Sequence, residues 1–363
     1  MVSRTPKSCR STGHYGLQTD GADKVPKTDS DLAWDWLDTI TTSWLHKHVT
    51  DNASDDRRPT IAVIDTGFNS QARFVDRKLK RRLGVLSGSN TQNRTWKDFW
   101  QSSVCPQDED GHSTAMLSII HRIAPFANIC VARIAAGDQD MKNDPGGTSN
   151  NLAKAITWAI EERKANIISL SLGWEQEQYV AENRIVSNAI SNALSHRNQN
   201  LLIFAAASNL GGSKLELFPA NHPSVILIRG TNNKGKHEDF NPSLPDDPHK
   251  RNDDVFGTLG VQVPTANQRS HLQQFSPRNG TSVATAIAAG IAGIVVGYIN
   301  IHDTKGAWEN VRTHDHFRTL LYKLSTKPEV RKRFITLDRY SREEDQTKFE
   351  AALSIASNSK VRR

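Results

Sequence analysis

The chain has 363 residues, a hydrophobic share of 37% and a formal net charge of +7, with 46 Lys and Arg against 39 Asp and Glu. This length allows one large domain or two ordinary ones, and the mixing of both charge signs favours a solvated surface. Basic runs at Arg77 to Arg82 and Lys360 to Arg363 carry no interleaved aromatic residues, and no zinc-finger or RNP pattern occurs. We therefore expect neither a nucleic-acid partner nor a membrane partner.

The three cysteines, Cys9, Cys105 and Cys130, are scattered along the chain and odd in number. This pattern fits neither a disulfide framework nor a metal cluster, and we expect no cofactor and no metal. The first 27 residues lack the apolar core of a signal peptide, and the apolar residues 282–299 are too rich in Ala and Gly for a membrane span. The expected location is therefore intracellular, in the cytoplasm.

Residues 1–58 are expected to form a disordered leader followed by a short helical segment. Residues 1–29 are rich in small, polar and charged side chains. Ser30 or Asp31 could then cap a helix whose apolar residues are Leu32, Trp34, Trp36, Leu37, Ile40, Trp44 and Leu45. The polar residues 50–59 are typical of a linker.

Strands and helices are expected to alternate between residues 59 and 300, in the main domain. Five apolar runs are typical of buried strands: 61–64, 128–135, 167–172, 201–207 and 225–229. Apolar residues at helical spacing predict three connecting helices: 113–123, 152–160 and 180–196. Residues 137–150 and 231–254 are polar and predict loops. Strands separated by helices of this length predict an α/β fold, a mostly parallel sheet with helices on both faces.

Residues 301–363 are expected to form a charged helical extension. Apolar residues recur there at helical spacing: Phe317, Leu320, Leu321 and Leu324. These C-terminal helices are also the part of the chain where we expect partner proteins to bind.

Four reactive side chains follow predicted strands or open predicted helices. Asp65 directly follows the first strand and Asn209 follows the strand that starts at Leu201, while His112 and Ser282 each precede or open a helix. In open α/β sheets, ligands bind at the carboxyl ends of the strands. A serine in the first turn of a buried helix also lies where free N–H groups and the helix dipole favour negative charge.

Each of these residues has a purely structural alternative. Asp65 and Asn209 could form turns, and His112 and Ser282 could lie at helix starts as caps. The chain order Asp, His, Ser is nevertheless one of the few in which the Ser-His-Asp catalytic triad occurs. The presence of all these residues at strand ends and helix starts therefore favours a hydrolase.

Five segments resemble the sequence blocks of subtilisin-like serine peptidases (subtilases, with a peptidase S8/S53-type catalytic domain) and occur in that family's order. Residues 61–67 (IAVIDTG) resemble its Asp block, 110–114 (DGHST) its His block and 280–285 (GTSVAT) its Ser block. Residues 171–173 (SLG) resemble the strand that lines the substrate cleft, and 205–209 (AAASN) the segment with the oxyanion-hole asparagine. The resemblance runs from about residue 61 to residue 298 and includes signal-less members found in filamentous fungi.

The resemblance implies a serine endopeptidase with a three-layer α/β/α fold that acts on proteins or peptides through an acyl-enzyme. The implied site residues are Asp65, His112 and Ser282 as the catalytic triad, Asn209 in the oxyanion hole, and Ser171, Leu172 and Gly173 beside the substrate.

Two departures from the family pattern lie close to these blocks. Ser113 stands where glycine is usual after the histidine, and Trp174 stands where a small residue is usual after the cleft strand. They leave open an alternative function, a catalytically impaired regulatory or binding module with the subtilase fold. A nucleotide-binding α/β protein is a third alternative, but the sequence has no Gly-rich phosphate loop to support it.

Overall fold

A nine-stranded sheet forms the centre of the computed structural model, which describes residues 27–85, 94–177, 184–244, 254–266 and 275–360. The strand order is β10-β11-β7-β6-β5-β4-β1-β3-β2. The strands are β1 (Thr60–Asp65), β2 (Trp96–Asp98), β3 (Asn128–Arg133), β4 (Ile167–Leu170), β5 (Leu202–Ala206), β6 (Ile226–Thr231), β7 (Val255–Leu259), β10 (Ser325–Glu329) and β11 (Lys332–Ile335). Every neighbouring pair is parallel except β10 with β11.

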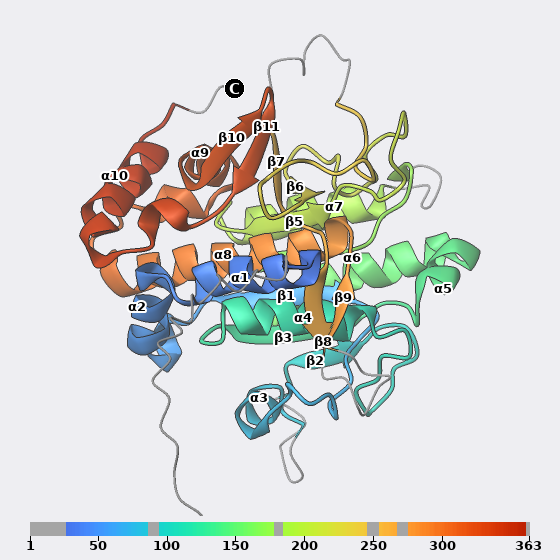
Figure 1. Ribbon diagram of the computed structural model, residues 1–363. Helices are drawn as coiled ribbons and strands as arrows, with labels where there is room; N and C mark the ends of the chain where they lie inside the picture. The colour runs from blue at the N-terminus through green and yellow to red at the C-terminus, as the bar shows by residue number, and fades with distance from the viewer. Residues whose placement is uncertain (1–26, 86–93, 178–183, 245–253, 267–274, 361–363) are drawn as a thin grey trace, which may run out of the picture.

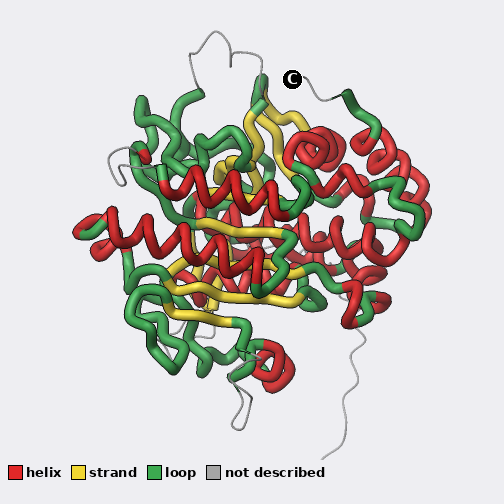
Figure 2. The backbone as a smooth tube through the Cα atoms, turned by 180° about the vertical axis from the view of Figure 1, so that it is seen from behind, coloured by secondary structure: helices red, strands yellow, loops and turns green. Residues whose placement is uncertain are grey.

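Helices cover both faces of this sheet, which confirms the predicted α/β fold class (Figure 1, Figure 2). The helices over one face are α1 (Asp29–Thr41), α2 (Trp44–Asn52), α4 (His112–Ile123), α8 (Thr281–His302), α9 (His314–Leu324) and α10 (Gln346–Ser357). The opposite face carries α6 (Pro145–Glu161) and α7 (Ile185–His196). Two shorter helices, α3 (Arg77–Arg82) and α5 (Asp138–Asn143), lie in the connections.

Alternation along the strands divides the core into two layers. In β1, Ile61 and Val63 belong to the apolar cluster around α8, whereas Ala62 and Ile64 belong to the cluster under α6 and α7. Successive side chains of a strand point to opposite faces, and both faces of a parallel sheet are buried. This is why the strands of this chain appear as unbroken apolar runs in the sequence.

Helix α8 is the central support of the first layer. It has the length and apolarity of a membrane span, and among the described residues it is the one helix that does, but 94% of its apolar 18-residue stretch is buried inside the fold. Three of its glycines lie against neighbouring elements. A Cβ atom at Gly290 would lie 2.8 Å from Ile123 of α4, and one at Gly297 would lie 2.7 Å from Val49 of α2. These glycines set how closely α8 approaches its neighbours.

The N-terminal helical segment differs from the sequence prediction in its cap and its continuity. Thr28, rather than Ser30 or Asp31, caps α1, and its side chain accepts a hydrogen bond from the backbone N–H of Asp31. The helix then breaks, and Ser43 caps a second helix, α2. The residues predicted as a linker contain the end of α2 and a short 3₁₀ turn at Asp55–Arg57. Residues 1–26 of the predicted leader lie outside the described residues.

Two further predictions are wrong. Residues 137–150, predicted as a loop, contain α5 and the start of α6, because Asp144 caps α6 and Pro145 occupies its first turn. The C-terminal segment, predicted as helical throughout, contains the hairpin β10–β11, and β11 extends the sheet beside β7. The polar sequence of β10 hides this hairpin, since Pro and charged residues are tolerated on an edge strand. Residues 180–183 of the helix predicted at 180–196 lie outside the described residues.

A two-stranded antiparallel ribbon, β8 (Val263–Ala266) with β9 (Phe275–Arg278), lies beside the main sheet. It packs against α4 and α1, and the ring of Phe275 meets Trp34 edge-on, with the ring centroids 5.1 Å apart. The ribbon matters for function because β9 leads directly into the segment that begins α8.

We expect Gly290→Val to lower the free energy of unfolding by about 1–3 kcal/mol, because the added side chain overpacks the contact of α8 with Ile123. Urea unfolding followed by circular dichroism measures the change. Ala351→Val, a comparable enlargement on the exposed side of α10, serves as the control. Equal stability of the two variants would contradict the tight packing described for α8.

Candidate active site

The carboxyl ends of four adjacent strands form one edge of the sheet. β3, β1, β4 and β5 are neighbours and all run parallel. Asp65 is the last residue of β1, Ser171 directly follows β4, and Asn209 comes shortly after β5. β1 pairs with β3 on one side and with β4 on the other, so the crevice lies at a topological switch point, where α/β sheets bind ligands.

Asp65 and His112 are joined by a close double contact. The Nδ1 atom of His112 lies 2.9 Å from Oδ1 and 3.0 Å from Oδ2 of Asp65. The Asp65 side chain is only 3% exposed, whereas the His112 side chain is 25% exposed. Gly111 precedes the histidine with φ of 83°, a left-handed conformation that favours glycine. The turn places the imidazole over the end of β1 with one edge open to solvent.

Burial and the neighbouring carboxylate act in opposite directions on His112. Burial disfavours the charged imidazolium, but the negative charge of Asp65 and the hydrogen bond to it outweigh that effect. Together they raise the pKa of His112 from 6.5 to about 9. Asp65 therefore stabilises the cationic form of the ring, which is the form produced when a histidine accepts a proton.

Asp108 fixes the turn that carries His112. Its Oδ1 accepts hydrogen bonds from the Gly111 N–H and the Thr66 hydroxyl, both at 2.8 Å. Its Oδ2 accepts from the N–H and the hydroxyl of Thr114, at 2.8 and 2.6 Å. One buried carboxylate thus ties the end of β1 to the start of α4. Asp108 is not among the site residues predicted from the sequence, although its place three positions before a glycine that precedes a helix is typical of Asp in turns.

Ser282 lies in the first turn of α8 and faces the end of β4. Its Oγ lies 3.5 Å from the carbonyl oxygen of Ser171, and the Ser171 hydroxyl donates to the Ser282 carbonyl at 3.3 Å. Within the described residues, Ser282 Oγ makes no hydrogen bond with His112. Such catalytic hydrogen bonds are often long in unliganded proteins and shorten when substrate binds.

Asn209 is locked against the start of α8. Its Oδ1 accepts hydrogen bonds from the N–H of Thr281 at 2.7 Å and from its hydroxyl at 3.1 Å. A Cβ at Gly280 would lie 2.9 Å from Asn209 Nδ2, and Gly280 has φ of 127°, so only glycine suits this position. Because the oxygen is held by Thr281, the Nδ2 donor remains; it has no acceptor among the described residues.

A single cavity of about 810 Å³ contains these groups. The sequence-predicted residues that line it are His112, Ser171, Leu172, Gly173, Asn209 and Ser282. Asp65 lies beneath it, in contact with His112. Trp174 also lines the cavity, and its backbone pairs with Phe218 through hydrogen bonds of 2.8 and 2.7 Å. The structure thus brings together at one edge of the sheet the residues that the sequence placed there.

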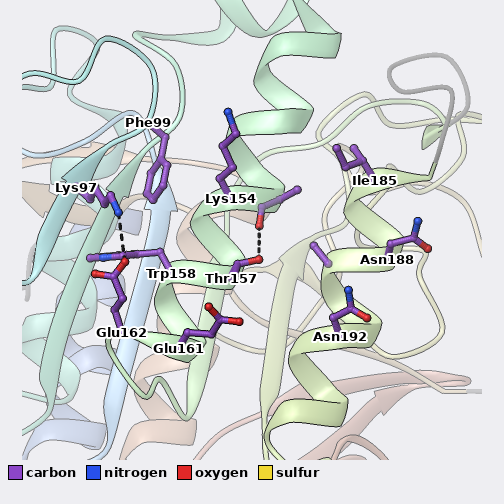
Figure 3. Close-up of a pocket in the computed structure, with 12 residues that line it drawn as sticks. Lys97, Phe99, Lys154, Thr157, Trp158, Glu161, Glu162, Ile185, Asn188 and Asn192 are labelled. Carbon is purple, nitrogen blue, oxygen red and sulfur yellow. Dashed lines mark hydrogen bonds and ion pairs between the residues drawn. The ribbon is translucent and has the colours of Figure 1, made fainter.

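A second hollow, of about 540 Å³, lies between α6 and α7 on the opposite face of the sheet (Figure 3). An ion pair joins Lys97 to Glu162 there at 3.3 Å, and the Thr157 hydroxyl donates to the carbonyl of Ala153 at 3.1 Å. Its lining residues include no Ser, Cys or His. The residues that line this hollow thus lack the histidine and serine found together in the first cavity.

The acidic residues between 138 and 144 have structural roles. Asp140 accepts a hydrogen bond from the N–H of Ala136, and Asp144 accepts one from Gly147 at the start of α6. In the parts of the chain that the structure describes, no group of three or more His, Cys, Asp or Glu side chains could hold a metal ion.

Comparisons with known proteins identify related sequences and folds. The family model described as Peptidase_S8: Subtilase family matches residues 56–323. The "Subtilisin-like protease het-Q2" of Podospora anserina is 27% identical over 264 residues, which are 66% of this chain and 69% of the relative. "Thermitase" of Thermoactinomyces vulgaris is 26% identical over 252 residues, which are 65% of this chain and 74% of the relative.

Solved structures share the fold. "Structure of Prenylagaramide maturation protease PagA" has a TM-score of 0.57 at 20% identity and covers 82% of this chain and 98% of its own. "Crystal structure of a cold adapted subtilisin-like serine proteinase" has a TM-score of 0.54 at 20% identity, with 80% and 92% covered. At this level of identity the likeness concerns the fold alone.

We expect Asp65→Asn to lower the pKa of His112 from about 9 to below 6.5, because burial then acts without the opposing carboxylate. NMR titration of the His112 ring, assigned with His112→Gln, measures both values. In the unsubstituted protein the raised pKa stabilises the fold fully below pH 6.5, and this contribution is lost as the pH rises through about 9. An unchanged pKa in Asp65→Asn would contradict the described coupling.

Proposed function

The chain belongs to the subtilase family, and we propose that it hydrolyses peptide bonds with Asp65, His112 and Ser282 as its catalytic triad. Family membership makes it a serine endopeptidase, a hydrolase that acts on proteins or peptides. The observation that carries the residue assignment is the double contact of His112 Nδ1 with the Asp65 carboxylate, at 2.9 and 3.0 Å, beside the cavity that Ser282 lines.

The contact with Asp65 defines the role of each His112 nitrogen. Nδ1–H donates to the carboxylate, so in the neutral ring Nε2 is the nitrogen that accepts a proton. In the proposed mechanism Nε2 takes the proton of Ser282 as Oγ attacks the peptide carbonyl. His112 then delivers this proton to the leaving amine, and an acyl-enzyme forms on Ser282. Water releases the acyl group by the same steps in reverse order.

The oxyanion of the tetrahedral intermediate would be held by Asn209 Nδ2 and the backbone N–H of Ser282. The Asn209 oxygen is already occupied by Thr281, which fixes the amide in the orientation that presents Nδ2. The Ser282 N–H belongs to the first turn of α8, where backbone N–H groups have no partner within the helix. Preorganised donors of this kind stabilise developing negative charge.

The segment Ser171, Leu172 and Gly173 would hold the substrate as an added strand. Within the described residues, the backbone N–H and C=O groups of Leu172 and Gly173 make no hydrogen bond, whereas those of the next residue, Trp174, are used by Phe218. An extended peptide could therefore pair with Leu172 and Gly173 and stop at Trp174.

The alternative function is a catalytically impaired binding module, and the surroundings of Ser113 bear on it. Ser113 is buried, its N–H donates to the Thr66 hydroxyl at 3.2 Å, and its own hydroxyl has no hydrogen-bond partner among the described residues. It does not compete for the His112 ring. Because binding alone does not require a complete triad, the arrangement favours an active enzyme.

Two sequence predictions about the cellular setting stay predictions: the intracellular location and the binding of partner proteins at the C-terminal helices. The apolar side chains that suggested a helical surface there, Phe317, Leu320 and Leu321, are buried in the core. Partners at this end of the molecule would therefore contact other side chains, such as the exposed Ile355 on α10.

We expect a fluorophosphonate probe to label the purified protein at Ser282 and to fail on Ser282→Ala. The probe reports an activated serine without any assumption about the substrate sequence. Labelling is measured by intact-mass spectrometry, with circular dichroism to show that each variant is folded.

Ser113→Gly is the matched control for this experiment, and it should be labelled like the unsubstituted protein. Labelling of Ser113→Gly alone would support the impaired module, with Ser113 as the residue that silences it. If both folded proteins stayed unlabelled, the assignment of Ser282 as the nucleophile would be wrong.

We expect Asn209→Ala to lower kcat on the order of 10²–10³-fold, a magnitude known from subtilisin, a member of this family, rather than obtained from this structure. Asn209→Asp keeps the acceptor for Thr281 but removes the donor, so it should be at least as impaired. Steady-state hydrolysis of a peptide substrate measures both. Near-normal kcat in Asn209→Asp would show that Nδ2 does not bind the oxyanion.

A further inference from the structure

We propose that Arg278 binds an acidic side chain on the leaving-group side of the scissile bond, so that the enzyme prefers substrates with Glu or Asp there. The inference rests on the proposed function, since it assigns a substrate preference to the same cavity.

Arg278 is a half-buried cation on the wall of the cavity. It is the last residue of β9, it lines the cavity with His112 and Ser282, and within the described residues its guanidinium makes no hydrogen bond or ion pair. Two other buried arginines of this fold differ. Arg133 pairs with Asp98 at 3.1 Å, and Arg229 pairs with Glu216 at 2.8 Å. A guanidinium held in a cleft with its donors unused is suited to a carboxylate of the substrate.

The backbone around Arg278 is firmly held. Arg278 is paired with Val263 across the ribbon, and the next residue, Asn279, accepts a hydrogen bond from the Gln262 N–H at 2.6 Å. Gly280 then donates to the carbonyl of Gly260 at 2.8 Å. Three residues separate Arg278 from Ser282 along this fixed path. The guanidinium therefore enters the cavity from the segment that leads into the nucleophile.

The place of Arg278 at the end of β9, on the segment that leads into Ser282 and apart from residues 171–173, assigns it to the leaving-group half of the substrate. The acyl half would lie along Ser171 to Gly173, as proposed above, on a different wall of the cavity. His112 would deliver its proton to the leaving amine. The positive charge of Arg278 opposes the cationic form of His112, and the negative charge of Asp138 favours it, so both side chains act on the ring across the cavity. Residues of the substrate that follow the scissile bond would thus pass between His112 and Arg278.

Three acidic residues and one lysine also line the cavity: Asp110, Asp138, Glu175 and Lys142. Within the described residues, no ion pair joins Asp138 or Glu175 to Arg278. An acidic substrate residue therefore gains only where its carboxylate lies within reach of the Arg278 guanidinium. A partly buried arginine–carboxylate pair contributes more binding free energy than an exposed one. We therefore expect kcat/KM to be about three- to tenfold higher for a substrate with an acidic residue there than for one with a neutral residue.

Matched peptides test this preference. A proteome-derived peptide mixture digested by the unsubstituted enzyme first provides a cleaved sequence. Quenched fluorescent peptides are then made with Glu or Gln, at each of the first three positions after the scissile bond. The Glu/Gln ratio of kcat/KM is measured at one pH, so that any effect of Arg278 on the protonation of His112 cancels. We expect a ratio of about three to ten at one or more positions, decreasing with salt.

Three variants assign the preference to a residue. In Arg278→Ala the ratio should fall to about one, and in Arg278→Glu it should invert, because the cleft then repels the acidic peptide. Lys142→Ala, which removes another cation of the same cavity, should keep the ratio of the unsubstituted enzyme. Labelling of Ser282 by the uncharged fluorophosphonate probe shows that each variant retains a folded site.

A ratio of one at all three positions in the active enzyme, or the same ratio in Arg278→Glu as in the unsubstituted protein, would overturn the proposal. Failure of the proposed function looks different. In that case the unsubstituted protein cleaves no peptide, and the probe does not label Ser282. The proposed role of Arg278 would then be wrong as well.

Discussion

The contact between Asp65 and His112 is the constraint on which the rest of the site depends. It joins the last residue of a central strand to the first residue of a helix, 47 positions later in the chain. The strand end is fixed because β1 is paired on both sides, and the helix start is fixed by the hydrogen bonds that Asp108 accepts. The side chain of Asp65, which is only 3% exposed, holds the His112 ring because the end of the strand and the start of the helix are both fixed.

Much of this arrangement could be predicted from the sequence because it has local signals. The buried strands are continuous apolar runs, as both faces of a parallel sheet require. Asp65 and Asn209 follow such runs, and His112 and Ser282 occupy helix starts, so their neighbourhood follows from topology alone. Asp108 and Arg278 could not be found in this way. Their roles come from the path of a turn and of a ribbon edge, which apolar periodicity does not encode.

The errors have a common physical origin. Asp, Asn, Gly and Pro between residues 137 and 150 suggested a loop, yet Asp144 and Pro145 are the cap and first turn of a helix. The strand β10 contains Lys327, Pro328 and Glu329, residues that disfavour a central strand but suit an edge. In both places, residue types that usually mark loops instead begin a helix or form an edge strand. Only tertiary packing distinguishes these roles.

The hairpin β10–β11 has a consequence for how the molecule can be divided. The family match ends at residue 323, just before β10 begins, and β11 pairs along β7. Without the hairpin, β7 would present a row of unpaired backbone groups, a template for pairing with other chains. A recombinant fragment trimmed to the family match would therefore expose an unpaired edge strand that is prone to pair with other chains. The hairpin β10–β11 is thus better regarded as a protective cover of the sheet edge than as an appendage to the enzyme.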